Sequence, residues 1–395
     1  MESKYKYAQM YIKRTIEHEV LAMAEVYSVV TITGPRQSGK TTLARHLFPQ
    51  LPYFSFENPD IRFAVESDPR AFLNQLNDGA IFDEVQHIPQ LLSYLQQIVD
   101  EGKNKLTFIL TGSNQFSLLN TISQSLAGRT AILKLLPFSL EEIPMGIKQS
   151  TNELLYKGFY PAIHSKKLNP TKAYRNYFET YLERDLRQLI QIKELSLFQK
   201  FMKICAGRIG NLFNASAIAS ETGVSVKTIQ SWVSILEASY VIMRLQPYFE
   251  NINKRLIKSP KLYFYDVGLA SYLLGIEKMQ HLERDPLRGA LFENMVVMEF
   301  VKKRFNKGMD NNLYFYRDSH HSEIDLIRRK GNDLNPIEIK SAQTFHPDFL
   351  KGLKRFEKLF GKRVGEMLLV YDGELQTKIR DVDIISFRSI EDISS

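Results

Sequence analysis

The chain has 395 residues, of which 44% are hydrophobic and 24% are charged, so its composition is that of a globular protein with room for two or three cores. Its 52 basic and 44 acidic side chains give a net charge of 52 − 44 = +8, and residues 151–395, with 38 basic and 29 acidic side chains, hold all of this excess. The asymmetry favours an anionic partner such as nucleic acid for the second part of the chain, although a solvated lysine-rich surface explains it equally well.

Several classes of protein are excluded. The single cysteine, Cys205, allows no internal disulfide and no cysteine-rich zinc site, which favours a reducing compartment. No apolar run approaches the roughly 18 residues that a membrane-spanning helix needs, and the polar N-terminus lacks the apolar segment of a signal peptide. We therefore expect a cytoplasmic protein.

The first third of the chain alternates between strand and helix patterns. A helix is predicted over residues 8–26. Short apolar segments separated by helical patterns predict four strands: Val29–Thr33, Tyr53–Phe56, Ala80–Phe82 and Leu106–Leu110. Because strands that alternate with helices form parallel sheets, we expect an α/β domain with a doubly wound parallel sheet.

The rest of the chain is predicted to be mixed. Pro170–Ile204 has the pattern of long helices, and Asn214–Leu245 that of two helices around a short turn, followed by a strand. A boundary is expected at Glu283–Pro286. After it come a helix, short strands, a helix over Pro347–Phe360 and a final strand, Met367–Tyr371.

A glycine-rich turn directly follows the first strand. Its sequence, GPRQSGKTT, fits the phosphate-loop pattern G-x-x-x-x-G-K-[ST] between an apolar strand and a predicted helix. In such a loop the backbone N–H groups and the helix N-terminus attract phosphate, the lysine reaches the β- and γ-phosphates, and the next hydroxyl ligates Mg²⁺. With ATP and Mg²⁺ as ligands, the predicted binding residues are Gly34, Pro35, Arg36, Gln37, Ser38, Gly39, Lys40, Thr41 and Thr42.

Two neighbouring acids end the third predicted strand. Asp83 is predicted to hold Mg²⁺ together with Thr41, and Glu84 to polarise the attacking water as a general base. The strand 106–110 should lie between the two motif strands, which would place small polar residues after it near the γ-phosphate.

The candidates for contacting the γ-phosphate are Thr111 and Ser113. Arg129 either stabilises charge in the transition state or forms a structural salt bridge, and the sequence leaves both open. A role for Arg129 on a neighbouring subunit would require a homo-oligomer.

These motifs make the first part of the chain resemble the AAA+ branch of P-loop ATPases. The series GPRQSGKTTL, FDEVQ, LTGSN, LAGR and LPFSLEE, followed by Tyr181–Leu186 and Pro260–Asp266, resembles a widespread family of bacterial and archaeal ATP-binding proteins over nearly the whole chain. The C-terminal domain of that family is similar to PD-(D/E)XK nucleases. The resemblance implies four parts: an AAA+ P-loop domain (1–145), a helical lid or linker (146–205), a winged helix (206–285) and a restriction-endonuclease-like α/β domain (286–395).

The segment 215–235 has the pattern of a helix-turn-helix. Apolar residues keep helical spacing on both sides of a turn at Gly223, and Ser225 is a good N-cap for the second helix. The exposed face of that helix and the wing after it would present Lys227, Thr228, Gln230, Ser231, Lys254, Arg255 and Lys258. DNA contact and packing against protein both stay open, because the exposed face lacks an arginine cluster.

A second charged cluster is predicted near the end of the chain. Ser322–Leu326 and Pro336–Lys340 have the pattern of two strands joined by a hairpin. Because side chains alternate along a strand, Ile324 and Leu326 are expected on one face, with Asp325 on the other. Pairing of the two strands would bring Asp325, Glu338 and Lys340 together, and Glu293 from a helix predicted over Gly289–Lys303 could add a fourth ligand.

Such a cluster suits metal-assisted phosphodiester hydrolysis. Asp325 and Glu338 would bind Mg²⁺, and Lys340 would orient the nucleophile or neutralise phosphate charge. The order matches the D…E-x-K arrangement of PD-(D/E)XK nucleases, except that Ile324 stands where the proline would be. The catalytic residues predicted for cleavage are Glu293, Asp325, Glu338 and Lys340, while a solvated hairpin or a nuclease fold that only binds remains the alternative.

The resulting hypothesis is a Mg²⁺-dependent ATPase whose nucleotide cycle moves a winged helix and a nuclease-like domain on DNA. The rival hypothesis is a nucleotide-controlled switch or scaffold, in which the last domain binds a protein partner without cutting.

Overall fold

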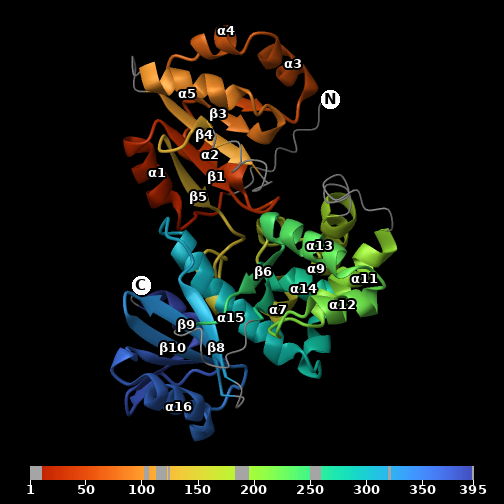
Figure 1. The fold of residues 1–395 in the computed structure, drawn as a ribbon, viewed down its shortest axis with the longest axis vertical. Helices are drawn as coiled ribbons and strands as arrows, with labels where there is room; N and C mark the ends of the chain where they lie inside the picture. Colours follow the sequence, from red (N-terminus) through yellow and green to blue (C-terminus); the bar gives the residue numbers. More distant parts are fainter. Residues whose placement is uncertain are drawn as a thin grey trace, which may run out of the picture.

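The computed structural model describes residues 11–101, 106–112, 122, 125–182, 195–249, 259–318 and 322–393. Figure 1 shows the first domain at one end, the helices of the middle region beside the centre and the C-terminal domain at the other end. Helix α15 (Arg288–Phe305) runs through the centre. Within the described ranges, no helix has both the length and the apolarity needed to span a bilayer.

The first domain is built on a five-stranded parallel sheet with the order β2-β3-β4-β1-β5. The strands are β1 (Val29–Thr33), β2 (Tyr53–Ser55), β3 (Gly79–Asp83), β4 (Thr107–Gly112) and β5 (Thr130–Lys134). The four predicted strands are confirmed, and β4 lies between β1 and β3 as expected. Edge strand β5 is not predicted from the sequence, because it is short, has polar residues at both ends and turns Ile132 outward.

Helices cover both faces of this sheet. The cluster that contains Val30 and Ile32 packs against α1 and α2, whereas the cluster that contains Phe82 and Phe108 packs against α3, α4 and α5. The helices are α1 (Glu17–Val26), α2 (Lys40–Leu47), α3 (Pro59–Ser67), α4 (Pro69–Asn74) and α5 (Leu91–Glu101). The predicted helix over 8–26 starts only at Glu17 in the described residues, because the Glu17 carboxylate accepts a hydrogen bond from the backbone N–H of Arg14 and fixes a non-helical entry.

The middle region is mostly helical. Its elements are α7 (Thr151–Lys157), α8 (Pro161–Ser165), α9 (Pro170–Tyr177), a π-helical turn (Phe178–Leu182), α11 (Leu195–Ala206), α12 (Ala215–Thr222), α13 (Val226–Ala238), β6 (Ile242–Leu245), β7 (Lys261–Phe264) and α14 (Val267–Leu273). The predicted pair of helices around a turn is confirmed as α12 and α13. Gly223 adopts a φ of 86° in the turn, and Ser225 caps α13 by accepting a hydrogen bond from Thr228 N–H at 3.1 Å.

The C-terminal domain contains a six-stranded mixed sheet with the order β12-β13-β11-β10-β9-β8. Helix α15 packs on one face and α16 on the other. Its other elements are β8 (Leu313–Arg317), β9 (Glu323–Lys330), β10 (Asp333–Lys340), a 3-10 turn (Pro347–Leu350), α16 (Lys351–Phe360), β11 (Met367–Tyr371), β12 (Thr377–Ile379) and β13 (Val382–Ser386). The prediction that Met367–Tyr371 is the last strand is wrong, because two short strands with charged residues follow it.

A β-bulge in β9 decides which of its residues share a face. Tyr314 pairs with Ile327 and Tyr316 with Ile324, so two residues of β9 stand opposite one residue of β8. Consequently Ile324 packs on the α16 side and Leu326 on the α15 side. The prediction that these two residues share a face is wrong, because simple alternation holds only in a strand without a bulge.

One hydrophobic core joins the middle region to the C-terminal domain. It continues from the helices around α14 through α15 to residues such as Ile337 and Val370 of the C-terminal sheet. The same core takes up Leu136, Phe138, Leu140 and Ile143 from the end of the first domain. The domain divisions expected from the sequence stay predictions, and packing continues across all of them.

Candidate functional site

The predicted phosphate loop runs from the end of β1 into α2. A Cβ on Gly34 would lie 2.0 Å from the carbonyl oxygen of Leu135, so the backbone passes the end of β5 too closely for any other residue. Gly39 caps α2 with a φ of 96°, in the left-handed region that favours glycine. The loop therefore makes the turn from strand to helix that the motif requires.

Lys40 lies buried against its own loop. Its Nζ donates hydrogen bonds to the carbonyl oxygens of Gly34 (3.0 Å) and Pro35 (2.9 Å). Burial lowers the pKa of Lys40 to about 8, and the charges of Glu84 and Asp83 oppose this shift. Because its hydrogen-bond acceptors are neutral, Lys40 keeps a positive charge that an anionic ligand can neutralise.

Asp83 is held by hydroxyl groups. Its Oδ1 accepts hydrogen bonds from Thr41 Oγ1 (2.9 Å) and from the Thr111 hydroxyl, and its Oδ2 accepts one from Tyr53 OH (2.8 Å). Hydroxyl donors leave the charge of the carboxylate uncompensated, and the oxygen atoms of Thr41 and Asp83 are the ligands that Mg²⁺ prefers. Thr111 is thus bound to Asp83 here, whereas Ser113 lies outside the described residues.

Glu84 directly follows β3 and adopts a φ of 53°, which is strained for a residue with a side chain. Its carboxylate accepts a hydrogen bond from the Gln86 side chain. Glu84 lines the same cavity as Lys40, Thr41 and Asp83. The structure thus brings together the residues predicted for phosphate binding, metal binding and water activation.

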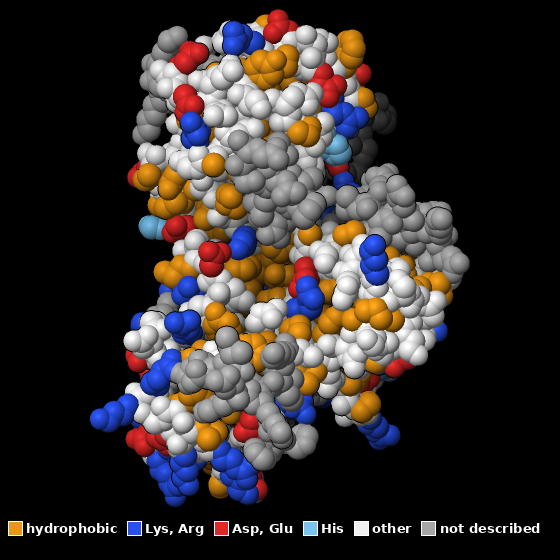
Figure 2. All heavy atoms as spheres, in the orientation of Figure 1, with side chains coloured by type: hydrophobic (Ala, Val, Ile, Leu, Met, Phe, Trp, Pro, Cys, Tyr) orange, Lys and Arg blue, Asp and Glu red, His pale blue; other side chains and the backbone are white. Residues whose placement is uncertain are grey.

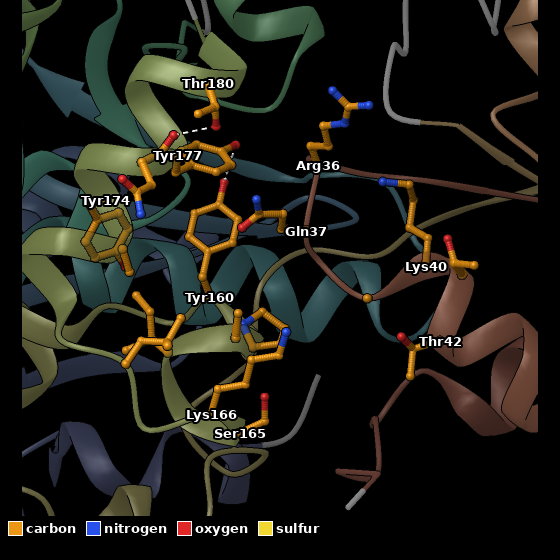
Figure 3. Close-up of a pocket in the computed structure, with 18 of the residues that line it drawn as sticks. Arg36, Gln37, Lys40, Thr42, Tyr160, Ser165, Lys166, Tyr174, Tyr177 and Thr180 are labelled. Carbon is orange, nitrogen blue, oxygen red and sulfur yellow. Dashed lines mark hydrogen bonds between the residues drawn. The ribbon is translucent and has the colours of Figure 1, made fainter. Parts of the chain in front are cut away.

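A cavity of about 600 Å³ lies between the phosphate loop and the helices of the middle region. Figure 3 shows Arg36 and Lys40 on one side and Tyr160, Tyr174 and Tyr177 on the other. The hydroxyl groups of Tyr160 and Tyr177 are hydrogen-bonded at 2.8 Å. No local sequence pattern predicts this role for the tyrosines, because nothing in the sequence shows that α8 and α9 form the opposite wall.

Arg14 fixes the loop from outside the cavity. Its guanidinium donates to the carbonyl oxygens of Ser38 (2.8 Å) and Leu136 (2.7 Å), and its Nε lies 3.1 Å from a carboxylate oxygen of Glu142. Only 4% of Arg14 is exposed. This role was not predicted from the sequence, because the partners of Arg14 lie far along the chain and no motif marks it. Tyr53 was missed for a similar reason, since only the pairing of β2 with β3 brings it to Asp83.

A smaller cavity of about 100 Å³ adjoins the loop on the side of the N-terminal segment. Tyr11 and Ile12 line it together with Phe138 and Pro161. Ser38, Gly39 and Thr42 line it on the loop side, and Arg14 and Ser165 complete the lining. Most of the surface of this smaller cavity is nevertheless apolar.

Within this chain Arg129 forms a structural salt bridge, which is one of the two roles predicted for it. Its Nε and Nη2 lie 2.5 and 2.9 Å from the carboxylate of Asp100. Arg129 precedes β5, so it lies at the edge of the parallel sheet opposite to the phosphate loop, and a contact with the phosphate site of its own chain is excluded. A role toward a neighbouring subunit stays a prediction.

The C-terminal cluster also assembles. Lys340 Nζ lies 2.6 Å from Glu338 Oε1 and 3.7 Å from Asp325 Oδ2, and Asp325 accepts a hydrogen bond from the backbone N–H of Ile339 at 2.8 Å. The second carboxylate oxygen of Glu338 is buried without a hydrogen-bond partner. Burial, followed by the charge of Asp325, raises the pKa of Glu338 to about 8.

Strand β7 of the middle region reaches into this cluster. Lys261 Nζ lies 3.1 Å from Glu293 Oε1 and 2.6 Å from Glu323 Oε1, and Tyr263 OH donates to Glu293 Oε1 at 2.5 Å. The Pro260–Asp266 run was singled out by resemblance alone, and no sequence signal connected it to the acids. Among the described residues, no group of three or more His, Cys, Asp and Glu side chains is arranged to hold a metal ion.

The predicted DNA-contact face of α13 is solvent-accessible. Lys227, Gln230 and Ser231 are exposed, and Thr228 is half-buried beside the Ser225 cap. The predicted wing residues Lys254, Arg255 and Lys258 lie outside the described residues. Figure 2 shows Lys and Arg side chains gathered at the end of the C-terminal domain that carries α16, where Lys351, Arg355 and Lys358 are exposed.

Three family models match the chain. Residues 26–144 match an AAA domain, residues 148–280 a domain of unknown function (DUF8612) and residues 288–390 another domain of unknown function (DUF4143). Over 356 residues the chain is 31% identical to the uncharacterized protein Rv2008c of Mycobacterium tuberculosis, and the match covers 89% of this chain and 78% of the relative. The chain belongs to the family of this protein. The uncharacterized protein Mb2031c of Mycobacterium bovis matches with the same identity and coverage.

Solved structures are more distant. The Walker-type ATPase of Pyrococcus abyssi is 14% identical with a TM-score of 0.44, and the match covers 67% of this chain and 97% of that one. The RuvB Holliday junction branch migration motor of Thermotoga maritima is 18% identical with a TM-score of 0.31, covering 58% of this chain and 88% of that one.

Proposed function

We propose that the protein is a Mg²⁺-dependent ATPase. The observation that carries this proposal is the cavity in which Lys40, the Thr41–Asp83 pair and Glu84 meet at the end of a strand–loop–helix turn. Lys40 would exchange its carbonyl partners for the β- and γ-phosphates, and Thr41 and Asp83 would hold Mg²⁺. Glu84 would accept the proton of the attacking water.

The base of the nucleotide would occupy the smaller recess. Tyr11, Ile12 and Phe138 offer apolar surface there, and the recess shares Gly39 and Thr42 with the lining of the larger cavity. A nucleotide that spans both would touch the first domain and α8 together, since Pro161 lines both cavities. This supports a nucleotide cycle that changes how the middle region sits on the first domain.

Hydrolysis of ATP by the full-length protein, measured as phosphate release, tests this proposal. Lys40→Ala is expected to lower turnover by about 10²–10³-fold, because it removes the positive charge nearest to the phosphates. Lys166→Ala is the matched control, because this lysine lines the same cavity on the opposite side. Equal turnover of wild type and Lys40→Ala would contradict the proposal.

For the coupled activity, we propose DNA as the partner. The exposed face of α13 and the basic side chains on α16 support this. Binding to duplex and single-stranded DNA over a series of salt concentrations tests it, because each neutralised phosphate steepens the slope of log K against log salt by about 0.7–0.9. A flat slope would contradict phosphate contacts.

Cleavage by Glu293, Asp325, Glu338 and Lys340 is the further step proposed for the C-terminal domain. Mg²⁺-dependent nicking of plasmid DNA should be abolished by Asp325→Ala and by Glu338→Ala. Nicking that survives both substitutions would remove this step.

The rival role, a nucleotide-controlled switch or scaffold, is favoured by one observation. The acids of the C-terminal cluster already pair with lysines, as they would in a domain that binds without cutting. In that case a protein partner would be captured in the presence of ATP, and capture would be indifferent to Asp325→Ala.

A further inference from the structure

The C-terminal cluster divides its acids between two lysines. Lys340, from β10, pairs with Asp325 and Glu338, whereas Lys261, from β7, pairs with Glu293 and Glu323. Arg317 adds a contact of 3.4 Å to Glu323. Three cations of the protein itself thus contact four carboxylates, so the cations are one fewer than the acids.

Lys261 is the unusual member of this set. It belongs to the middle region, while every acid that it contacts belongs to the C-terminal domain. Its side chain is only 3% exposed, and its Nζ lies 5.6 Å from the centre of the Phe315 ring. Burying the ammonium group of Lys261 would cost much free energy without the carboxylates beside it. The same ion pair therefore holds Lys261 in place and orients Glu293.

One carboxylate oxygen of the cluster suits a hard cation as its partner. Glu338 is 9% exposed, and its Oε2 has no hydrogen-bond partner although its Oε1 binds Lys340. A hard cation with oxygen ligands would satisfy this atom. The remaining ligand needed from α15 is Glu293, whose Oε1 is already taken by Lys261 and by the hydroxyl of Tyr263.

We propose that Lys261 is a positioning residue that keeps the carboxylate cluster closed to divalent metal, and that the cluster takes up metal when β7 withdraws Lys261 from Glu293. This inference rests on the metal role proposed above for Asp325 and Glu338. The ammonium group supplies the positive charge that Glu293 requires, and a metal ion beside it would meet both like charge and an occupied ligand atom.

The strand that carries Lys261, β7, is connected to the proposed nucleotide site by hydrogen bonds. Asp266, which follows β7 closely, accepts hydrogen bonds from the backbone N–H of Phe159 (2.7 Å) and from Tyr174 OH (2.6 Å). Tyr174 lines the large cavity, and Phe159 adjoins Tyr160 in its wall. A nucleotide that shifts this wall would therefore act on the strand that carries Lys261.

Calorimetric titration of Mn²⁺ into the full-length protein without nucleotide tests the inference. Lys261→Met is expected to bind Mn²⁺ at least about tenfold more tightly than wild type, because it frees Glu293 and removes a competing charge. Lys261→Met combined with Glu338→Gln should lose this gain. Lys303→Met is the matched control, since Lys303 is a buried lysine of α15 whose partners, the carboxylate of Glu391 and the carbonyl oxygens of Ile390 and Glu391, lie outside the cluster.

Thermal melting gives a second readout. Lys261→Met should melt at a lower temperature than wild type in EDTA and recover in Mn²⁺, whereas wild type should respond little to the metal. If Lys261→Met does not fold, Tyr263→Phe decides, because it removes only one donor to Glu293 and should raise Mn²⁺ affinity in part.

Two results would overturn the inference and are distinguishable. Tight Mn²⁺ binding by wild type that depends on Asp325 and is not improved in Lys261→Met or Tyr263→Phe would leave the proposed metal site intact and remove the role of Lys261. No Mn²⁺ binding to the cluster in any variant would remove both.

Discussion

The two charged sites of this protein combine lysine and carboxylates in opposite ways. In the first domain Lys40 contacts neutral carbonyl groups and Asp83 contacts hydroxyl groups, with a cavity of about 600 Å³ beside them. In the C-terminal domain Lys261 and Lys340 lie directly on the acids. We call the first site open, because charged groups with neutral partners can bind a charged ligand directly. We call the second site closed, because one of its ion pairs must break before a charged ligand can bind.

The largest expected effect tests the open site. Glu84→Gln should lower ATP hydrolysis by about 10²–10⁴-fold, because the amide cannot accept a proton from water. Binding of a non-hydrolysable ATP analogue should change little, since the amide has nearly the same shape. Glu57→Gln is the control, because Glu57 lines the same cavity but pairs with Arg36. Undiminished hydrolysis by Glu84→Gln would remove the proposed general base.

The next effect concerns the support behind the open site. Arg14→Met should lower the free energy of unfolding by about 3–5 kcal/mol, because it leaves the carboxylate of Glu142 buried without its cation. Arg14→Lys should fall between this variant and wild type, since it keeps the charge but cannot reach both carbonyl oxygens. Urea unfolding measures both. An unfolding midpoint equal to that of wild type would show that the loop does not depend on this ion pair.

A smaller effect concerns Asp266, which connects strand β7 to the wall of the large cavity. Burial raises the pKa of Asp266 above its ordinary 3.8, so the folded protein binds this proton more tightly than the unfolded chain does. The free energy of unfolding should therefore fall as the pH rises from about 4 to the folded pKa, by about 1.4 kcal/mol for each pH unit between the unfolded and folded pKa values.

Asp266→Asn should remove that part of the pH dependence. Urea unfolding over a pH series, with wild type in parallel, measures it. If the two proteins show the same slope over this range, the pKa of Asp266 is not raised.

The smallest effect is expected at Arg129. Because this arginine pairs with Asp100 on the surface and away from the phosphate loop, Arg129→Ala should leave turnover of the dilute protein unchanged. Turnover is then compared at rising protein concentration. A loss that develops only where chains associate would assign Arg129 to the site of a neighbouring subunit.

The open site could be predicted from the sequence better than the closed one, for a physical reason. The phosphate loop is local, so glycine, lysine and threonine within one turn determine both its backbone and its chemistry. The positions of Asp83 and Glu84 follow from the strand that precedes them. The parts that were missed, Arg14, Tyr53 and the tyrosines of α9, depend on contacts between distant segments, which no local pattern encodes.

The closed site depends on two contacts between distant segments that the sequence does not reveal. The pattern in β9 predicts strict alternation, but the bulge sends Ile324 and Leu326 to opposite faces. The motif around Glu338 and Lys340 predicts a cluster of nearby residues, but the pairing of regions brings in Lys261 from a strand of the middle region. The sequence predicted that Asp325, Glu338 and Lys340 lie together, as they do, and only the tertiary structure shows that Lys261 contacts Glu293 and Glu323.

The shared core has a practical consequence for taking the protein apart. Phe138 and Leu140 leave the first sheet and bind α15 through their backbones: Phe138 O accepts a hydrogen bond from Lys302, and Leu140 N–H donates one to Glu299. A fragment that ends near residue 145 would expose the apolar side chains of Phe138 and Leu140 to water. A fragment that starts there would keep Glu299 and Lys302 without their hydrogen-bond partners on Leu140 and Phe138. The two fragments should therefore associate when they are co-expressed, whereas each fragment expressed alone should aggregate.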